Sequence, residues 1–489
     1  MKRTIWPGMR RRFHPRLAAG LTAAACGLAA CVTPPPSPEP QATIAIPATF
    51  NAVDVESQID TETRDWWTRF DDPLLIRLVE EALSRNRQLA LAQANIATAR
   101  AQLASQLLGR SYSTTSTASA DLGRAARDGA DVELSATGNL GASWEYDAFG
   151  RIEAQIESAR FDLIATEEAR RDVAVIIAGE TARAYADLRG GQIRLAVAER
   201  NAELQGDSLE LLRTLAENGR ATRLDIERAE SQYRTTLATL PQLQSDLLTA
   251  AARLATLTGY PNAAAAPLVN EALDGSLGIP EPPLTLSGAT PEDMIRRRPD
   301  IRAAEADIAS FLALGEVERA NLFPTLTFNA NIFTLFNDTN DLSDSFGFGL
   351  GPGIRWDGPD LRSVRADIDI ADARTQAAFV AYENTVISAL GEVEIALTEY
   401  AQELSRRNDL EIAAGSAERA AELALLRFEE GLDDFLDVID AQRTLLVAQD
   451  RLEQSRLEST RRAIAAYRAL GGIWTTDALD AAAQSEEPN

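Results

Sequence analysis

Histidine and cysteine are almost absent from this chain of 489 residues, which has one histidine and two cysteines. His14 and Cys26 lie within the first thirty residues, and the second cysteine is Cys31. Residues 31–489 therefore contain no histidine, which excludes Ser-His-Asp and Cys-His catalysis and zinc sites built on imidazole or thiolate. Carboxylate-based hydrolysis would still need paired acids in a compact pocket. The sequence offers no domain of that kind, and we expect no enzymatic activity and no metal site.

Residues 1–30 combine six basic side chains with the start of a small-apolar run, "LAAGLTAAACGLAAC", that ends at Cys31. This pattern is typical of a secretory signal peptide and is too short for a membrane-spanning helix. The closing "LAAC" resembles a bacterial lipobox, which predicts removal of residues 1–30 and attachment of diacylglycerol and palmitoyl groups to Cys31. Val32 follows, rather than the aspartate of lipoproteins kept at the inner membrane, and favours the outer membrane. An ordinary signal peptide with an incidental cysteine is the alternative.

Positive charge is also in deficit, with 48 basic and 73 acidic residues in the whole chain. The predicted signal peptide holds six of the basic residues and no acidic ones, so the mature chain has a net charge of −31. This sign argues against nucleic acid or an anionic lipid surface as a partner. An acidic lining could favour cations in a conduit, although a solvated acidic exterior would explain the charge equally well.

The two ends of the mature chain lack any regular period. Residues 31–60 begin with "CVTPPPSPEP", a proline-rich tether that would follow the lipid anchor. Residues 473–489 form a small polar tail. The ordered body is therefore expected between these two segments.

The same turn sequence occurs twice in that body, 212 positions apart. "GRATRLDIERAE" (219–230) aligns with "GLDDFLDVIDAQ" (431–442), and the "LTG" and "LGG" motifs that follow have the same spacing. We therefore predict two internal repeats, 61–260 and 296–472, joined by a connector at 261–295. Each repeat consists of a helix, a pair of strands and a long helical hairpin.

Helical periodicity dominates both repeats. Apolar residues spaced by three or four predict long helices at 151–217 and 361–429, each on the order of 100 Å long. Shorter helices are predicted at 86–109 and 299–321. Helices of this length need neighbours along their whole length, as in a generic coiled coil or a helical barrel.

Four short segments change to a period of two. "ELSATGNLGASWEYD", "PTLTFNANIFTLF" and "SFGFGLGPGIRWD" alternate apolar and polar residues over about ten positions, the length of a transmembrane strand. Trp144 and Trp356 fall at strand ends, where interfacial aromatic residues occur. The fourth segment, near 111–122, is so polar that a loop would suit it equally well. An ordinary surface sheet is the alternative for the whole set.

Four strands cannot close a barrel, and an open sheet edge in lipid leaves backbone groups unpaired. Two, three or four copies of the chain would supply eight, twelve or sixteen strands. The predicted fold class is therefore a membrane β-barrel plus an α-helical barrel, closed only by association of identical chains.

The chain resembles the outer membrane factor family of TolC-like and OprM-like efflux ducts, in its NodT-type lipoprotein branch. The pieces that carry the resemblance are "LAAC", "RRRPDIRAAE", "ERANLFPTLTF", "WDGPDLRSV" and "RFEEGLDDFLDVIDAQR". The resemblance covers the mature chain and implies a homotrimer with a twelve-stranded barrel and a twelve-helix periplasmic tunnel.

The function implied is the outer membrane channel of a tripartite efflux system that passes small molecules to the exterior. Its partners would be outer membrane lipids, a periplasmic adaptor and an inner membrane pump of the RND or ABC type. A duct for type I protein secretion is one alternative. A periplasmic adaptor lipoprotein, of a different class, would have one hairpin rather than two.

The resemblance also implies positions for a gate. Residues early in the last long helix of such ducts constrict the inner aperture, and the matching positions here are Leu436, Asp440 and Arg443. Leu436 and Asp440 share one helix face because they are four residues apart. Arg228 is the internal-repeat equivalent of Asp440 and, with Arg443, a candidate ion-pair partner for it.

Gly219 and Gly431 are expected at the hairpin tips. Glycine suits the left-handed backbone conformation that ends a helix. The resemblance implies that these tips close the duct and contact the adaptor.

Overall fold

The computed structural model describes residues 46–47, 50, 65–124, 132–275, 278–281, 290–337, 345–356, 358 and 360–471. The predicted signal peptide, Cys31 and the predicted tail lie outside these residues. Within the described part, no helix combines the length and the apolar character needed to cross a membrane.

The order of elements repeats along the chain, as the spacing of the turns predicted. The first series is α3 (Arg87–Leu107), β1 (Ser113–Arg124), β2 (Val132–Tyr146), α4 (Arg151–Glu217), α5 (Arg223–Leu237) and α6 (Leu240–Leu257). The second series is α9 (Pro299–Ala320), β3 (Thr325–Asn337), β4 (Phe346–Arg355), α10 (Arg362–Glu429) and α11 (Phe435–Ala469). Short helices accompany them: η1 (Trp66–Phe70), α2 (Pro73–Arg85), η2 (Leu108–Arg110), η3 (Ala263–Ala265), α7 (Pro267–Asp274) and α8 (Pro291–Arg297).

The chain divides into two compact units that each draw on both series. The first unit takes Ala97–Ala165 and Glu305–Ala381 and holds the four strands. The second takes Thr43–Ile96, Thr166–Ala304 and Tyr382–Asn489 and holds the helical hairpins. The segments that form one unit are thus far apart in sequence.

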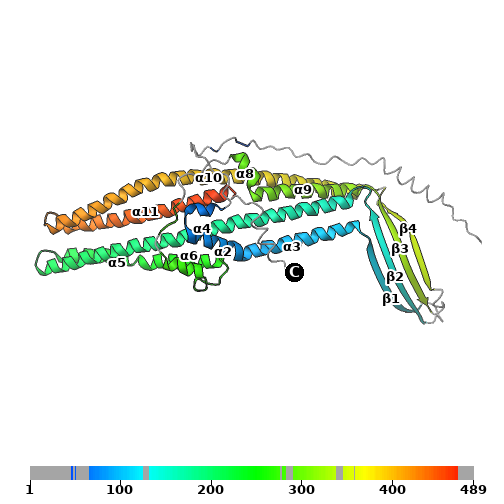
Figure 1. Ribbon diagram of the computed structural model, residues 1–489, viewed down its shortest axis with the longest axis horizontal. Coiled ribbons are helices and arrows are strands. Elements are labelled where there is room, and N and C mark those ends of the chain that lie inside the picture. The colour runs from blue at the N-terminus through cyan, green and yellow to red at the C-terminus, as the bar shows by residue number, and fades with distance from the viewer. Residues whose placement is uncertain are drawn as a thin grey trace, which may run out of the picture. The chain divides into compact units, whose positions relative to one another are not determined.

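In the first unit the strands form one antiparallel sheet of order β1-β2-β3-β4, and Figure 1 shows them side by side. Leu140 lies opposite Ile332, which lies opposite Phe348, so the apolar faces predicted for three strands coincide in register. The polar segment near 111–122 is β1, a strand rather than a loop. The outer edges of β1 and β4 have no strand neighbour in the described chain.

In the second unit the hairpins pack through α4 and α11. The Cβ that an alanine would add at Gly190 would lie 2.7 Å from Leu457 of α11, whereas one at Gly191 would lie 3.5 Å from Leu247 of α6. Adjacent glycines in α4 therefore bring two different helices close to its backbone.

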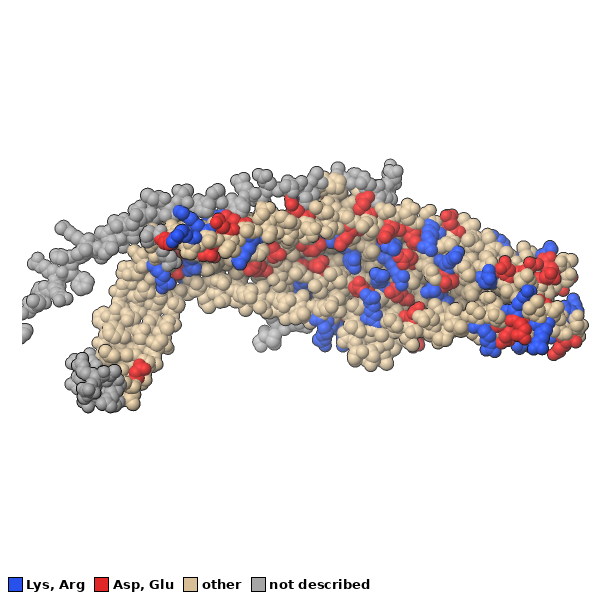
Figure 2. Space-filling view, turned by 180° about the vertical axis from the view of Figure 1, so that it is seen from behind, with Lys and Arg blue, Asp and Glu red and all other residues tan. Residues whose placement is uncertain are grey.

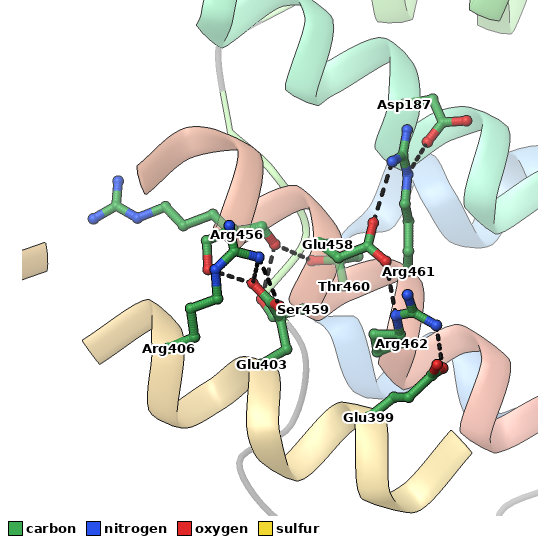
Figure 3. Close-up of polar contacts among 11 residues, drawn as sticks. Asp187, Glu399, Glu403, Arg406, Arg456, Glu458, Ser459, Thr460, Arg461 and Arg462 are labelled. Atoms are coloured by element: carbon green, nitrogen blue, oxygen red, sulfur yellow. Dashed lines mark hydrogen bonds and ion pairs between the residues drawn. The ribbon is translucent and has the colours of Figure 1, made fainter. Parts of the chain in front are cut away.

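Figure 3 shows how α11 is held between α10 and α4. Arg461 donates from Nε to Asp187 Oδ1 of α4 at 2.6 Å, and Arg462 pairs with Glu399 of α10. Both arginines also pair with Glu458 of their own helix. Three helices are thus joined by one ionic chain.

The return helix of the first hairpin is interrupted, whereas a single helix was predicted. It ends as α5 at Leu237 and resumes as α6 at Leu240. Pro241 has no N–H to donate to the carbonyl of Leu237 and therefore breaks the helical hydrogen bonds there. The equivalent position in α11 is Glu453, and that helix is continuous.

Two short helices, α2 and α8, each begin with a proline. The side chain of Asp72 caps α2 by accepting from the backbone N–H groups of Leu74 and Leu75 at 2.9 and 3.0 Å. The sequence "TPEDMIRRR" forms α8. The largest core of the second unit lies around such short helices, where the Trp66 and Tyr467 rings stack at 5.4 Å.

Candidate functional site

The sheet has one strongly apolar face. Even-numbered residues of β2, β3 and β4 point to this face, and Phe348 and Leu350 are 85% and 73% exposed. The opposite face of β3 and β4 carries mainly threonine, asparagine and glycine. Phe333 and Leu335 are its apolar exceptions. Burying the apolar face would be favourable by about 25 cal/mol for each Å² removed from water.

The charged residues are distributed unevenly between the two units. The sheet is almost entirely tan in Figure 2, whereas the helices of the second unit carry many red and blue side chains. Strand β3 contains no charged residue at all. A sheet of this composition suits a lipid environment better than water.

The two tryptophans expected at strand ends occupy different surroundings. Trp144 lies on the apolar face of β2, opposite Phe328, and is exposed. Trp356 follows β4 by one residue and packs with Leu322 and Leu361, donating from Nε1 to the Leu322 carbonyl at 3.0 Å. In the single chain, Trp144 is therefore the more exposed of the two.

Both predicted hairpin tips are tight turns centred on glycine. Gly219 and Gly431 have φ of +73° and +71°, the left-handed conformation that favours glycine. The N–H of Arg220 bonds to the Leu215 carbonyl and that of Leu432 to the Arg427 carbonyl, both at 2.8 Å. These are the hydrogen bonds that terminate a helix at a left-handed residue.

The two tips pack against each other within one chain. Leu212 of α4 and Phe435 and Val438 of α11 are buried in a common apolar cluster. Within the second tip, the Phe428 and Phe435 rings meet edge to face at 5.1 Å. Gln442 Nε2 also donates to Ser208 Oγ at 2.8 Å. The tips are therefore joined by buried contacts rather than placed independently.

The predicted gate residues lie on the exposed side of this cluster. Leu436 is 52% exposed, although Val438 nearby is fully buried. Arg443 lies 3.7 Å from Asp440, and both side chains are well exposed. Within the described residues of one chain, Arg228 makes no ion pair with Asp440. The structure thus brings Asp440 to Arg443 and leaves Leu436 available to another surface.

A cavity of about 640 Å³ lies between the two tips and was not foreseen from the sequence. Leu212, Leu215, Phe428 and Phe435 give it an apolar lining, and its charged lining residues are Arg220, Asp225, Glu429, Asp433 and Asp434. The pair of phenylalanines flanking the second turn is the one sequence feature that could have indicated it.

The second tip has an ion pair between residues on the two sides of its turn. Arg427 Nη2 donates to Asp433 Oδ1 at 2.8 Å across the turn. This hydrogen bond lowers the pKa of the Asp433 carboxyl from its usual range. The turn is thereby closed by an ion pair, whereas the first turn relies on the capping side chain of Thr222.

Comparison with protein families gives one match, which occurs twice. The family described as "outer membrane efflux protein" matches residues 78–260 and 290–472. Both ends of the second match lie 212 positions after those of the first. The family pattern therefore recurs at the spacing of the hairpin turns.

Individual relatives align over nearly the whole chain. Nodulation protein T of Rhizobium leguminosarum bv. trifolii is 30% identical over 88% of this chain and 91% of its own length. The pyoverdine export outer membrane protein OpmQ of Pseudomonas aeruginosa is 30% identical over 85% of this chain and 89% of its own. Among solved structures, the outer-membrane channel OprN is 32% identical, with a TM-score of 0.77 over 90% of this chain and 99% of that one.

Proposed function

Because the chain belongs to the outer membrane efflux protein family, we propose that three copies of it enclose the outer membrane duct of an efflux pump. The chain is the outer membrane component, and its relatives occupy that place in their own pumps. The duct conducts small molecules passively from the periplasmic side to the exterior. Chemical conversion of the cargo has no part in this function.

The observation that carries the proposal is the four-stranded sheet with two open edges and an apolar outer face. Unpaired strand edges in lipid cost several kcal/mol for each unsatisfied group, so the edges of one chain must pair with those of another. Three copies would give a twelve-stranded barrel, within the size range of bacterial outer membrane barrels. The long hairpins of the three copies would then line a periplasmic tunnel.

A lipid anchor at Cys31 completes the proposed attachment to the outer membrane. The motif "LAAC" after a basic and apolar segment supports it. Diacylglycerol and palmitoyl groups on this residue would place the N-terminus at the inner surface of the outer membrane. Intact-mass spectrometry of the purified protein tests this, and an unmodified N-terminus at residue 31 would contradict it.

The hairpin tips are the proposed contact with a periplasmic adaptor, which joins the duct to an inner membrane pump. Gly219 and Gly431 shape these tips, and the cavity between them offers both apolar and acidic lining. The relatives indicate a broad class of cargo, because one of them exports pyoverdine. Small organic molecules are therefore the proposed cargo.

The gate is proposed at three copies each of Leu436, Asp440 and Arg443, with Arg228 available as a further cation. An apolar ring beside a ring of carboxylates would narrow the aperture, and the neighbouring arginines would offset carboxylate repulsion. Replacing Asp440 by alanine should raise the conductance of the purified duct in a planar bilayer. Unchanged conductance would remove Asp440 from the gate.

The oligomer is tested by the mass of the detergent-solubilised protein, corrected for bound detergent. Three times the mature chain mass is expected, with a three-fold symmetric particle in electron microscopy. A folded monomer would overturn the proposal. Transport is tested separately by deleting the gene and measuring susceptibility to a panel of small organic compounds, where increased susceptibility restored by the cloned gene is expected.

A further inference from the structure

At the bases of the two hairpins, two equivalent positions hold different residues that make the same kind of hydrogen bond. Asn86 and Arg298 are 212 positions apart, and each precedes the first helix of its series. Asn86 Nδ2 donates to the Leu257 carbonyl at 2.9 Å, and Arg298 Nη1 donates to the Ala469 carbonyl at 2.7 Å. These two carbonyls are also 212 positions apart. Each residue therefore ties the end of a return helix to the start of its own repeat.

A second pair of equivalent residues has different ion-pair partners in the two hairpins. Glu180 of α4 and Glu392 of α10 are 212 positions apart as well. Glu180 pairs with Arg253 of α6, so the first hairpin is closed at its base by its own two helices. The position equivalent to Arg253 in α11 is Ala465, which cannot form that pair. The second hairpin therefore lacks an ion pair at this position, although Arg462 and Glu399 pair its two helices seven residues further along α10.

Arg298 supplies the missing cation from outside the second hairpin. Its Nη1 and Nη2 donate to Glu392 Oε2 at 3.1 and 3.0 Å. Its Nε and Nη2 donate to the two carboxylate oxygens of Asp300 at 3.0 and 2.6 Å. Together with the Ala469 carbonyl, these contacts engage all three guanidinium nitrogens. A planar guanidinium can make such a set of bonds, and an ammonium cannot.

The surroundings hold the Arg298 side chain in one place. It is 11% exposed, and Gly471 has φ of +89° where the chain passes over it. A Cβ at Gly471 would lie 2.7 Å from Arg298 Cγ, so only glycine leaves room for both. Removing one partner of a buried ion pair leaves the other charge uncompensated, which is strongly destabilising. The complete set of Arg298 contacts is therefore strongly preferred over a partial set.

We propose that Arg298 is a positioning residue that fixes the base of the α10–α11 hairpin and thereby holds its tip in place in the assembled duct. This rests on the proposed trimer. The tip at Gly431 is 39 residues beyond Glu392, or about 58 Å along the helix, so a tilt of a few degrees at the base displaces the tip by several ångströms. The first hairpin is closed at its base by Glu180 and Arg253, so it should depend less on Arg298, which acts on it through the charge of Asp172.

The test measures the two tips separately in the full-length trimer. Spin labels are introduced at Asn218→Cys or Glu430→Cys, which are exposed and occupy equivalent positions in the two turns. Distances between the three labels of each trimer are measured by pulsed dipolar spectroscopy. Protein with no added cysteine gives the background labelling, which should be low because the proposed diacylglycerol group blocks the Cys31 thiol.

Two variants break the contact between Arg298 and Glu392, one by changing the arginine and the other by changing the glutamate. R298N installs the residue of the first repeat, and E392Q removes the charge from α10 while keeping its size. R298K tests whether a cation alone suffices. R296N is the matched control, since Arg296 is exposed on α8 and, among the described residues, pairs only with Glu292 of the same helix.

Labels at position 430 should show a distance distribution that broadens or shifts by several ångströms in R298N and in E392Q, with a smaller change in R298K. Labels at position 218 should keep the wild-type distribution, as should R296N at both positions. An unchanged distribution at 430 in both variants, or equal changes at 430 and 218, would overturn the inference. If R298N fails to assemble, E392Q alone decides between these outcomes. Absence of dipolar coupling in the wild-type protein at both positions would instead contradict the proposed trimer itself.

Discussion

At the residue scale, the neighbouring glycines Gly190 and Gly191 have different contacts, so replacing each by alanine should have different effects. Gly190 of α4 lies against Leu457, and a methyl group there would come within 3.1 Å of three of its side-chain carbons. Gly191 has ordinary van der Waals room beside Leu247. The two positions have the same helical backbone, so their difference reports packing alone.

We therefore expect Gly190→Ala to lower the thermal stability of the proposed trimer and Gly191→Ala to leave it unchanged or raise it. Overpacking of a buried contact costs about 1–3 kcal/mol, while replacing glycine by alanine in a helix returns up to about 1 kcal/mol. The loss of trimer on heating, followed by gel electrophoresis, compares the two. Equal midpoints for both variants would show that α4 and α11 separate easily at this point.

Asp172 gives a prediction about pH. Burial raises the pKa of this carboxyl, with the nearby Asp300 carboxylate as the next cause and Arg298 opposing both. Glu392 and Arg468 also face it. The folded chain thus binds this proton at a higher pH than the unfolded chain, so the stability from Asp172 is present in acid and is lost as pH rises through the raised pKa.

Asp172→Asn should therefore stabilise the protein at pH 7 to 8 and have little effect near pH 4. The gain should be less than about 1 kcal/mol, because the group remains partly hydrated. Thermal midpoints of variant and wild type, measured across this pH range, should converge as the pH falls. A constant difference at all pH values would indicate a packing effect instead.

At the element scale, the two return helices begin differently although their sequences repeat. Thr222 forms a reciprocal capping box with Asp225, its Oγ1 accepting from the Asp225 N–H at 3.3 Å. Asp434, the equivalent residue, makes no side-chain capping bond to α11. The second turn is closed instead by Arg427 and Asp433.

Thr222→Ala should consequently loosen the first turn of α5, at a cost of about 1 kcal/mol. Asp434→Ala should change the start of α11 by much less. Hydrogen exchange of the backbone amides at the two helix starts measures this directly. Comparable acceleration in both variants would mean that the capping box contributes nothing specific.

The long helices and the strand faces followed from the sequence because each depends on a regular pattern over many residues. The helix bounds at 151–217 and 361–429 agree with α4 and α10 within one residue. The polar strand β1 was ambiguous because serine and threonine suit strands and loops alike, and pairing with β2 decides it. Pro241 interrupts the return helix between α5 and α6, and the single helix predicted for this segment is wrong at that point.

The candidate site was less accessible to prediction, for a physical reason. Positive φ at Gly219 and Gly431 is a local property of a turn, and it was predicted correctly. The partners of Arg298 at Glu392 and Ala469 are 94 and 171 residues away, a separation that no local pattern reveals. The gate residues stay a prediction, because in the proposed trimer their contacts would come from other copies of the chain.

At the scale of the whole molecule, charge separates the strand region from the helical region. The chain carries a net charge of −25, yet among the side chains that the structure describes the polar face of the sheet has few charged ones: Asp121, Glu145 and Arg355. Any preference for ions of one sign should therefore arise in the helical part of the conduit. An acidic lining there would concentrate cations and repel anions.

The open duct in a planar bilayer should accordingly prefer potassium to chloride when the salt concentrations on the two sides differ. The preference should be strong near 0.1 M salt, where screening extends over about 10 Å, and weak near 1 M, where it extends over about 3 Å. It should also fall below about pH 4, as carboxylates with ordinary pKa values become protonated. The reversal potential, measured on the Asp440→Ala variant to keep the aperture conducting, gives all three quantities. A preference for chloride, or a selectivity indifferent to salt, would place the acidic residues on the outer surface of the tunnel rather than along its lining.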